Sequence, residues 1–246
     1  MKIMIVRHGD PYYPTDSLTE KGFREAELLK DRLVKEKIDA FYCSPLGRAQ
    51  RTAEPTLKAL GREAETLYWL REFDAHITSP ISGNSRVSWD LPPSLWCADS
   101  RNYDLNDWVN SDLTVLGNAP EIFRETAEGV DEVLARYGMV REGMLYRGGE
   151  EKTLVFFCHF CLGITILAHL LGISPVVAQN NFFLAPTSVT TLVTETDAQG
   201  GTHFRAIATG AQQNGLAAGG IKGVDHQSGA ILTQSPYLHR RGFRVA

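Results

Sequence analysis

The chain has 246 residues, a formal net charge of −4 and a hydrophobic content of 43%. This length allows one α/β domain with a well-buried core or two small domains, and the composition is typical of a soluble globular protein. The negative charge argues against general nucleic-acid binding, which needs a basic surface. The apolar runs are too short for a signal peptide or a membrane-spanning helix. We therefore expect a cytoplasmic protein with neither nucleic-acid nor membrane partners.

The cysteines are too few to form a disulfide framework, which fits a reducing compartment. Two of them, Cys158 and Cys161, have the CxxC spacing of some redox and zinc sites. A single CxxC is a weak signal, because a structural zinc site needs a second pair of ligands. We expect both residues to pack near the sheet, and the histidine spacing indicates no metal site.

The first 72 residues alternate between short apolar runs and helical patterns. Three strands are predicted, at Lys2–Val6, Ile38–Cys43 and Thr66–Leu70. The helix after the first strand is capped by Thr19, runs to about Lys35 and buries a stripe of Phe23, Ala26, Leu29 and Leu33. The next helix is capped by Ser44, opens at Pro45 and ends near Gly61. This β-α-β-α-β order predicts a three-layer α/β/α sandwich with a mainly parallel sheet.

The rest of the chain is less regular. Residues 74 to 117 carry prolines and tryptophans without a clear period, which predicts an insertion over the sheet edge with a short helix near Asn102–Asn110. A long helix is expected from Asn118 to about Tyr146, with a buried stripe of Phe123, Ala127, Val130, Leu134 and Tyr137. A strand at Thr153–Cys158 and a helix from His159 to Leu171 are expected next. Ser188–Glu195 and His203–Ala208 are expected to form a hairpin. We expect an irregular tail from about residue 209, and one domain over residues 1–246.

Polar residues follow several predicted strands closely: Arg7 and His8, Arg48, Glu72, and His159. A parallel sheet brings such junctions to one edge, where ligands bind in α/β proteins. Two arginines and a helix start form an anion site. One neutral imidazole can attack phosphorus, a protonated carboxyl can donate to the leaving oxygen, and a second imidazole can donate to the phosphoryl oxygens. This set predicts phosphoryl transfer that needs no metal or cofactor.

Longer motifs now identify a family. Val6-Arg7-His8-Gly9 with Leu18-Thr19-Glu20-Lys21-Gly22, then Ser44-Pro45-Leu46-Gly47-Arg48-Ala49-Gln50-Arg51-Thr52-Ala53, resemble the phosphoglycerate-mutase-like branch of the histidine phosphatase superfamily. Glu72 and His159 follow in the same order as in that family. The resemblance covers roughly residues 1–72 and 150–195, and it implies a phosphoglycerate-mutase-like fold.

The resemblance also implies a role for each residue. His8 is expected to be the nucleophile that forms a phosphohistidine, and Arg7, Arg48 and His159 to bind the phosphoryl group of a small phosphorylated substrate. Glu72 is expected to be the acid for the leaving group and then the base for water, and Asp74 is its rival for this role.

The chain departs from the family pattern in several places. Asp10-Pro11-Tyr12-Tyr13-Pro14-Thr15 replaces a short polar run that usually ends in Asn, and Phe160 stands where a Gly usually follows the second His. Tyr12, Tyr13, Asn181 and Ser188 are candidates for the substrate rim, together with the tryptophans of the insertion. Hydrolysis of a phosphomonoester is the favoured function. A phosphoglycerate-type mutase and a non-catalytic binding module on the same fold are the alternatives.

Overall fold

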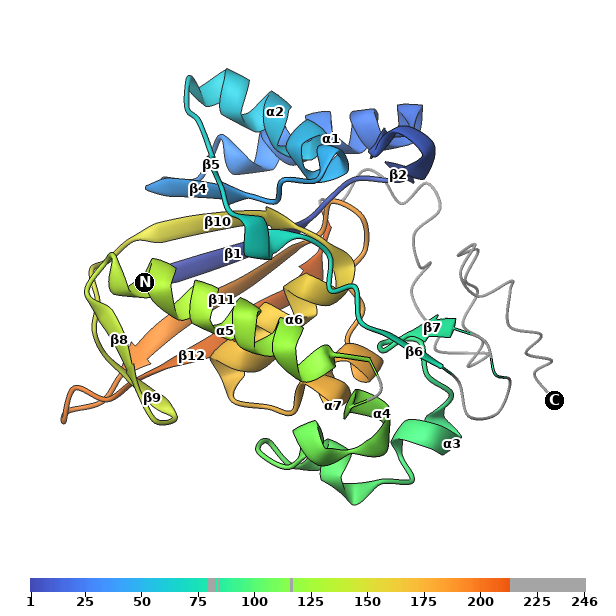
Figure 1. Ribbon diagram of the computed structural model, residues 1–246. Helices are drawn as coiled ribbons and strands as arrows, with labels where there is room; N and C mark the ends of the chain where they lie inside the picture. Colours follow the sequence, from blue (N-terminus) through green and yellow to red (C-terminus); the bar gives the residue numbers. More distant parts are fainter. Residues whose placement is uncertain (79–82, 84, 116, 213–246) are drawn as a thin grey trace, which may run out of the picture. The chain divides into compact units, whose positions relative to one another are not determined.

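Strand β1 (Lys2–Arg7) lies inside an eight-stranded sheet in the computed structural model, which describes residues 1–212 apart from 79–82, 84 and 116 (Figure 1). The strand order is β5 (Glu65–Thr66), β4 (Ala40–Cys43), β10 (Thr153–Cys158), β1, β11 (Val189–Thr196), β12 (Thr202–Ala211), β9 (Leu145–Gly148) and β8 (Met139–Glu142). The first four strands pair in parallel, and β11, β12, β9 and β8 add antiparallel pairs. The sheet is therefore mixed, with the predicted parallel core.

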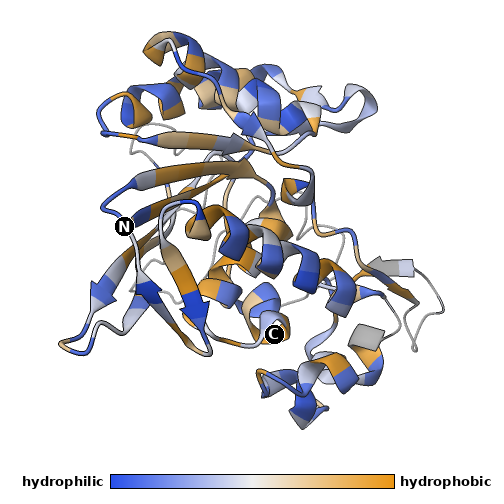
Figure 2. Cartoon of the chain, turned by 60° about the vertical axis from the view of Figure 1, so that its left-hand side comes forward, coloured by the Kyte–Doolittle hydropathy of each residue, from blue (hydrophilic) through white to orange (hydrophobic). Residues whose placement is uncertain are grey.

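Strand β1 is buried on both faces. Ile3 and Ile5 pack on the side of α5 (Ala119–Ala135) and α6 (Phe160–Leu171), whereas Met4 and Val6 pack against α1 (Glu20–Leu33) and α2 (Gly47–Leu60). This separation follows from the two-residue period of a strand, because successive side chains point to opposite faces. Helices therefore cover both faces of the sheet, as predicted for a three-layer α/β/α fold (Figure 1), and apolar residues concentrate on the central strands (Figure 2).

Helices α1 (Glu20–Leu33) and α2 (Gly47–Leu60) lie on one face. Thr19 caps α1 as predicted, since its hydroxyl accepts from the Gly22 amide. Two expectations were wrong. Phe23 is 44% exposed, while the rest of its predicted stripe is buried. Ser44 does not cap α2: the helix begins at Gly47 after Leu46, and the Ser44 hydroxyl bonds to His159 instead.

The third strand is shorter than predicted. Only Glu65 and Thr66 pair with β4, and the chain then forms a 3-10 turn at Tyr68–Leu70. The short helix expected near Asn102–Asn110 is replaced by two 3-10 turns, Ser100–Tyr103 and Trp108–Asn110. The same region holds a hairpin of β6 (His76–Thr78) with β7 (Ser85–Val87), and two one-turn helices, α3 (Pro93–Trp96) and α4 (Asp112–Val115). Its assignment as an insertion stays a prediction.

The long helix predicted from Asn118 to Tyr146 ends early. Helix α5 spans Ala119–Ala135, and the hairpin β8–β9 follows it. Gly138 and Gly143 adopt positive φ angles of 74° and 63°, which a right-handed helix cannot accommodate. Asn118 precedes α5 in a left-handed conformation and makes no side-chain capping bond. Of the predicted stripe, Val130 and Leu134 are fully buried, and Phe123, Ala127 and Tyr137 only partly.

Helix α6 (Phe160–Leu171) begins after His159 as predicted, and its residues are almost all buried. The short helix α7 (Pro175–Asn181) was not predicted. Strands β11 and β12 form the predicted hairpin, although β12 continues to Ala211, so the first residues of the expected tail are paired. The remainder of the tail lies outside the described residues, and the one-domain assignment of the whole chain stays a prediction. Within the described part, no helix is long and apolar enough to cross a membrane.

The cysteines pack as expected. Cys158 ends β10 and Cys161 lies in the first turn of α6, and both thiols are free and fully buried. Burial raises the pKa of each thiol, because a thiolate loses its hydration there. The CxxC pair is therefore part of the core between sheet and helix.

Candidate active site

The candidate site lies where three neighbouring parallel strands end. His8 follows β1, Ser44 follows β4 and His159 follows β10. Backbone bonds lock these ends together: the His8 amide donates to Cys158 O at 3.0 Å, and the Ser44 amide donates to Phe157 O at 2.9 Å. Side chains far apart in the sequence are therefore held together at the carboxyl ends of β1, β4 and β10.

Glycines and a threonine hold the loop after His8 in place. A Cβ atom on Gly9 would lie only 2.8 Å from the carbonyl oxygen of Gly22, so this close approach of loop and α1 requires glycine. The Gly9 amide donates to the Thr52 hydroxyl at 2.9 Å, and that hydroxyl donates to Arg48 O at 2.7 Å. Segments of three sequence motifs, around Gly9, Gly22 and Thr52, thus contact one another directly.

His8 is a buried, neutral imidazole with one nitrogen available. The side chain is 2% exposed, and its Nδ1 lies 2.7 Å from Gly9 O, which can only accept a hydrogen bond. Nδ1 must therefore carry the proton, and Nε2 keeps its lone pair. Burial, with added repulsion from Arg7 and Arg48, lowers the pKa of His8 to about 3. A neutral imidazole with a fixed tautomer is the form that can attack an electrophile.

His159 faces His8, with the ring centroids 5.2 Å apart. Its Nε2 lies 2.7 Å from the Ser44 hydroxyl, and its buried Nδ1 has no hydrogen-bond partner among the described residues. Burial, followed by the nearby positive groups, lowers the pKa of His159, so this ring is also neutral at pH 7. Because the Ser44 oxygen already accepts from the Leu46 amide at 3.2 Å, its own proton is available for Nε2. A hydroxyl that donates to Nε2 places the imidazole proton on Nδ1, and we assign His159 this tautomer.

Two arginines supply the positive charge of the site. Arg7, only 5% exposed, donates through one terminal nitrogen to Leu184 O at 2.5 Å, and its guanidinium lies 5.0 Å from the centre of the Phe160 ring. Arg48 pairs with the Asp16 carboxylate at 2.5 Å and lies 5.6 Å from the centre of the Tyr13 ring. The second oxygen of Asp16 accepts from the Gly47 amide at 2.5 Å, so this carboxylate fixes both Arg48 and the start of α2.

The Glu72 carboxyl group lies at the N-terminus of α6. One oxygen accepts from the amides of Cys161 and Leu162 at 3.1 and 3.0 Å, and the other accepts from the Phe160 amide at 3.2 Å. Burial raises the pKa of Glu72, while the amide donors, Arg7 and Arg48 act in the opposite direction. Burial has the larger effect, so the pKa lies above its ordinary value and favours a proton-carrying carboxyl group.

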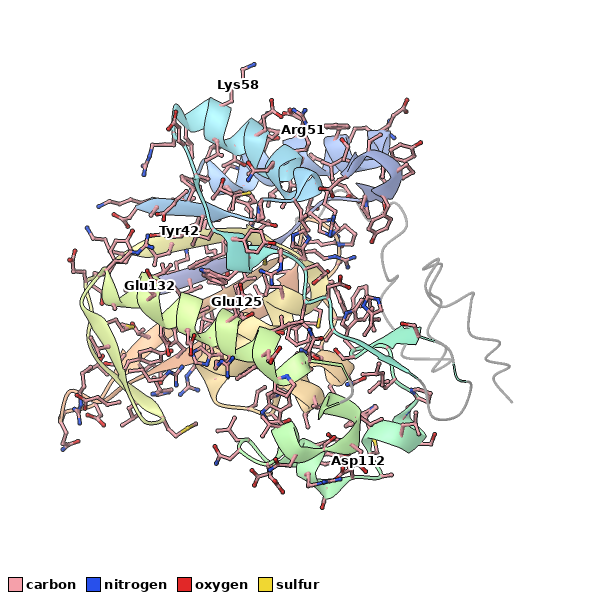
Figure 3. The ribbon with its side chains drawn as sticks, viewed as in Figure 1. Tyr42, Arg51, Lys58, Asp112, Glu125 and Glu132 are labelled. Carbon is pink, nitrogen blue, oxygen red and sulfur yellow. The ribbon has the colours of Figure 1, made fainter. Side chains whose placement is uncertain are left out.

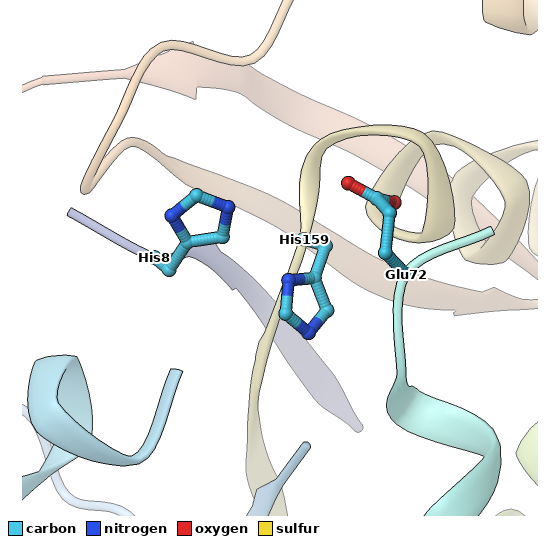
Figure 4. Close-up of side chains that lie close together, drawn as sticks. All are labelled: His8, Glu72 and His159. Atoms are coloured by element: carbon cyan, nitrogen blue, oxygen red, sulfur yellow. The ribbon is translucent and has the colours of Figure 1, made fainter. Parts of the chain in front are cut away.

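The side chains of His8, Glu72 and His159 converge (Figure 4), and one ligating atom from each lies within 4.8 Å of the others. Two imidazoles and a carboxylate are also a set that can bind a divalent metal. Here Arg7 and Arg48 place positive charge beside the same side chains, since both act on the pKa values of His8 and Glu72. The electrostatics therefore favour an anion over a cation.

The other predicted residues have different positions. Tyr12 and Tyr13 are 50% and 58% exposed on the loop after His8, and Tyr13 contacts Arg48 as described. Ser188 is buried beside β1, where its carbonyl accepts from the Arg7 amide at 3.2 Å. Asn181 is exposed at the end of α7, and its side chain donates to Val177 O in its own helix. The rim role of all four residues stays a prediction.

Asp74 and Arg51 lie outside the convergent group. The Asp74 carboxylate is 74% exposed and pairs with His76 at 3.0 Å. Arg51, labelled in Figure 3, is exposed and pairs with Glu54 at 3.0 Å. Sequence reasoning missed Ser44 and Asp16 as residues of the site. Ser44 belongs to the motif that carries Arg48, but its spacing before the helix suggested a cap instead.

Comparison with known proteins agrees with this geometry. The model of the histidine phosphatase superfamily (branch 1) matches residues 3–82, which hold His8, Arg48 and Glu72. Over this part, the chain is similar to that superfamily. A stretch of 85 residues is 32% identical to 2-carboxy-D-arabinitol-1-phosphatase of Triticum aestivum, covering 30% of this chain and only 17% of the wheat protein. The match therefore spans less than a fifth of that relative's length.

Several solved structures share the fold over most of both chains. A protein described as mycobacterial hydrolase 2 superposes with a TM-score of 0.62 at 18% identity, covering 88% of this chain and 93% of its own. The mycobacterial glucosyl-3-phosphoglycerate phosphatase, solved with VO3, superposes with a TM-score of 0.59 at 18% identity, covering 86% of this chain and 99% of its own. Phosphoserine phosphatase from Entamoeba histolytica, solved with 3-phosphoglyceric acid, superposes with a TM-score of 0.56 at 20% identity, covering 86% of this chain and 98% of its own.

Proposed function

We propose that this chain is a metal-independent phosphatase that hydrolyses a phosphomonoester through a phosphohistidine on His8. The observation that carries the proposal is the state of the His8 ring. Its Nδ1 is held by Gly9 O, and the depressed pKa keeps Nε2 unprotonated. A lone pair beside Arg7 and Arg48 suits attack on a phosphoryl group that these cations bind.

In the first step, His8 Nε2 forms a bond to phosphorus, and the bond from phosphorus to the leaving oxygen breaks. Glu72 donates its proton to that oxygen, and the raised pKa of its carboxyl supports this role. Arg7, Arg48 and the Nδ1 proton of His159 stabilise the charge that builds up on the phosphoryl oxygens. The positive charge needed for phosphoryl transfer thus comes from side chains, without a metal ion.

In the second step, Glu72, now a carboxylate, takes a proton from water while the water oxygen attacks phosphorus. The bond between phosphorus and Nε2 breaks, so inorganic phosphate leaves and His8 returns to its neutral tautomer. Glu72 is protonated again and the cycle closes.

The related structures support a small phosphorylated substrate, because two of them are named as phosphatases of a phosphoserine and of a glucosyl-phosphoglycerate. The segment Asp10–Thr15 differs from the pattern expected of the mutase alternative. That segment lies next to the site, since Asp16 at its end pairs with Arg48. Hydrolysis is therefore favoured over transfer to a second phosphoglycerate.

The test is hydrolysis of p-nitrophenyl phosphate in the presence of EDTA, with His8→Ala and the control His203→Ala, whose side chain is half exposed on β12. We expect activity in the wild type and in the control and none in His8→Ala. Full hydrolysis by His8→Ala, or loss of activity with EDTA, would refute the proposal. Interconversion of phosphoglycerates in a coupled assay, without net hydrolysis, would identify the mutase instead.

A further inference from the structure

Three aromatic rings meet at the edge of the candidate phosphate site. The ring of Phe160 lies 5.1 Å from that of Trp89 and 5.7 Å from that of Phe183, both tilted by 57°. We call Phe160, Phe183 and Trp89 the aromatic corner. Its residues come from the start of α6, the segment after α7 and the segment after β7, so the fold brings together three separate parts of the chain.

The aromatic corner adjoins the phosphate site directly. Phe160 covers the Arg7 guanidinium at 5.0 Å, and its amide donates to Glu72. Phe183 precedes Leu184, whose carbonyl accepts from Arg7 at 2.5 Å. The packing around Leu184 is tight: a Cβ atom on Gly163 would lie 3.0 Å from the Leu184 side chain. Rings and arginine are therefore held in a fixed relation to each other.

The aromatic corner also presents ring surface to solvent. Phe183 is 49% exposed, and both Phe160 and Trp89 are partly exposed. The three rings form one contiguous apolar patch beside a charged site, and such patches mark ligand-binding or interaction sites more often than single exposed side chains do. On the other side, Tyr13 places a further ring over Arg48. Each phosphate-binding arginine thus has an aromatic ring next to it.

Taking the proposed function as its basis, we infer that the aromatic corner selects phosphomonoesters whose leaving group carries an aromatic ring. The phosphoryl group would lie on Arg7 and Arg48, and the ring of the leaving group would pack against Phe160 and Phe183. Aromatic pairs prefer the tilted and edge-to-face arrangements already seen between these side chains, and they add to simple area burial. A saturated ring of the same size would lack this contribution.

The test compares benzyl phosphate with cyclohexylmethyl phosphate, whose leaving alcohols have similar size and acidity but differ in aromaticity. We expect the wild type to prefer benzyl phosphate by about fivefold in kcat/KM. Phe160→Leu and Phe183→Leu keep the apolar bulk and should bring this ratio close to one. Phe23→Leu, an exposed control on α1, should leave the ratio unchanged.

Two readouts separate this inference from the proposed function. Equal hydrolysis of both esters by the wild type would refute the inferred selectivity of the aromatic corner. So would a preference that persists in both leucine variants. Either result would leave the proposed phosphatase function standing. A wild type that hydrolyses no phosphomonoester would overturn both. Since Phe160 lies beside Arg7 and Glu72, its replacement can also lower activity on every substrate. In that case the ratio of kcat/KM values for the two esters in Phe183→Leu decides the test, because Phe183 is half-exposed.

Discussion

The Ser44 hydroxyl lies 2.7 Å from Nε2 of His159, at the ends of two adjacent parallel strands. Its oxygen also accepts from the Leu46 amide, and in the assigned tautomer of His159 the hydroxyl donates its proton to Nε2. Ser44 therefore sets the tautomer of His159, and with it the nitrogen that can donate to a phosphoryl oxygen in the proposed mechanism. A positioning residue of this kind affects chemistry without touching the substrate.

Replacing Ser44 by Ala should lower kcat by about tenfold, because the imidazole loses a hydrogen bond of about 1–1.5 kcal/mol that sets its tautomer. Nitrogen NMR of the histidines should show a mixture of His159 tautomers in place of one. Ser88→Ala is a matched control, because the Ser88 hydroxyl is buried and has no hydrogen-bond partner among the described residues. An unchanged tautomer and an unchanged kcat in Ser44→Ala would refute the role.

Glu72→Gln keeps the size of the side chain but cannot transfer a proton. We expect kcat to fall by about a hundredfold or more for alkyl phosphates. Esters with acidic leaving groups, such as p-nitrophenyl phosphate, should lose less, because their alcohols depart without a proton donor. The control is Asp74→Asn, the rival carboxyl, which is exposed and paired with His76. If Asp74→Asn shows the loss and Glu72→Gln does not, the acid has been assigned to the wrong residue.

Acid should destabilise the fold through His8. Its pKa is about 3 in the folded chain and about 6.5 in the unfolded chain, so below pH 6.5 the unfolded state binds a proton that the folded state does not. The free energy of unfolding then falls by about 1.4 kcal/mol per pH unit for this group, down to pH 3. In His8→Asn this contribution disappears, which denaturant titrations between pH 6 and 4 can measure. His203→Asn should keep the wild-type slope, and an equal slope in His8→Asn would contradict the buried neutral state.

A second polar cluster stabilises the fold away from the site. Asp131 of α5 accepts from Tyr146 at 2.7 Å and from Arg141 at 2.8 Å, and it lies 2.9 Å from Nε2 of His169 in α6. These contacts tie the hairpin β8–β9 to two helices. Burial opposes its charge, yet the partner groups lower the pKa of Asp131.

Asp131→Asn should therefore cost about 2–4 kcal/mol of unfolding free energy, because partly buried charges lose their partner. The value of kcat/KM should stay within about twofold. Arg147→Ala breaks an exposed pair with Glu142 in the same hairpin and should change stability by less than about 0.5 kcal/mol. Equal effects of the two substitutions on the melting temperature would contradict the structural role of the cluster.

The elements that position the site could be predicted from the sequence. Several elements away from the site could not. Apolar runs before His8 and His159 identified β1 and β10, since a strand buried on both faces leaves a clear signal. The hairpin β8–β9 was predicted as helix because its apolar spacing resembles a helical stripe. Gly138 and Gly143 were the signals of turns in this segment. Trp89 and Phe183 could not be placed beside Phe160, because contacts between distant segments depend on tertiary packing.

The central claim is that His8 carries the phosphoryl group during turnover. The most direct measurement is rapid quenching of the wild type with a phosphomonoester, followed by peptide mass spectrometry under basic conditions that preserve phosphohistidine. We predict one phosphoryl group on His8 and none in His8→Ala. A phosphoryl group on another residue, or unimpaired turnover by His8→Ala, would contradict the account.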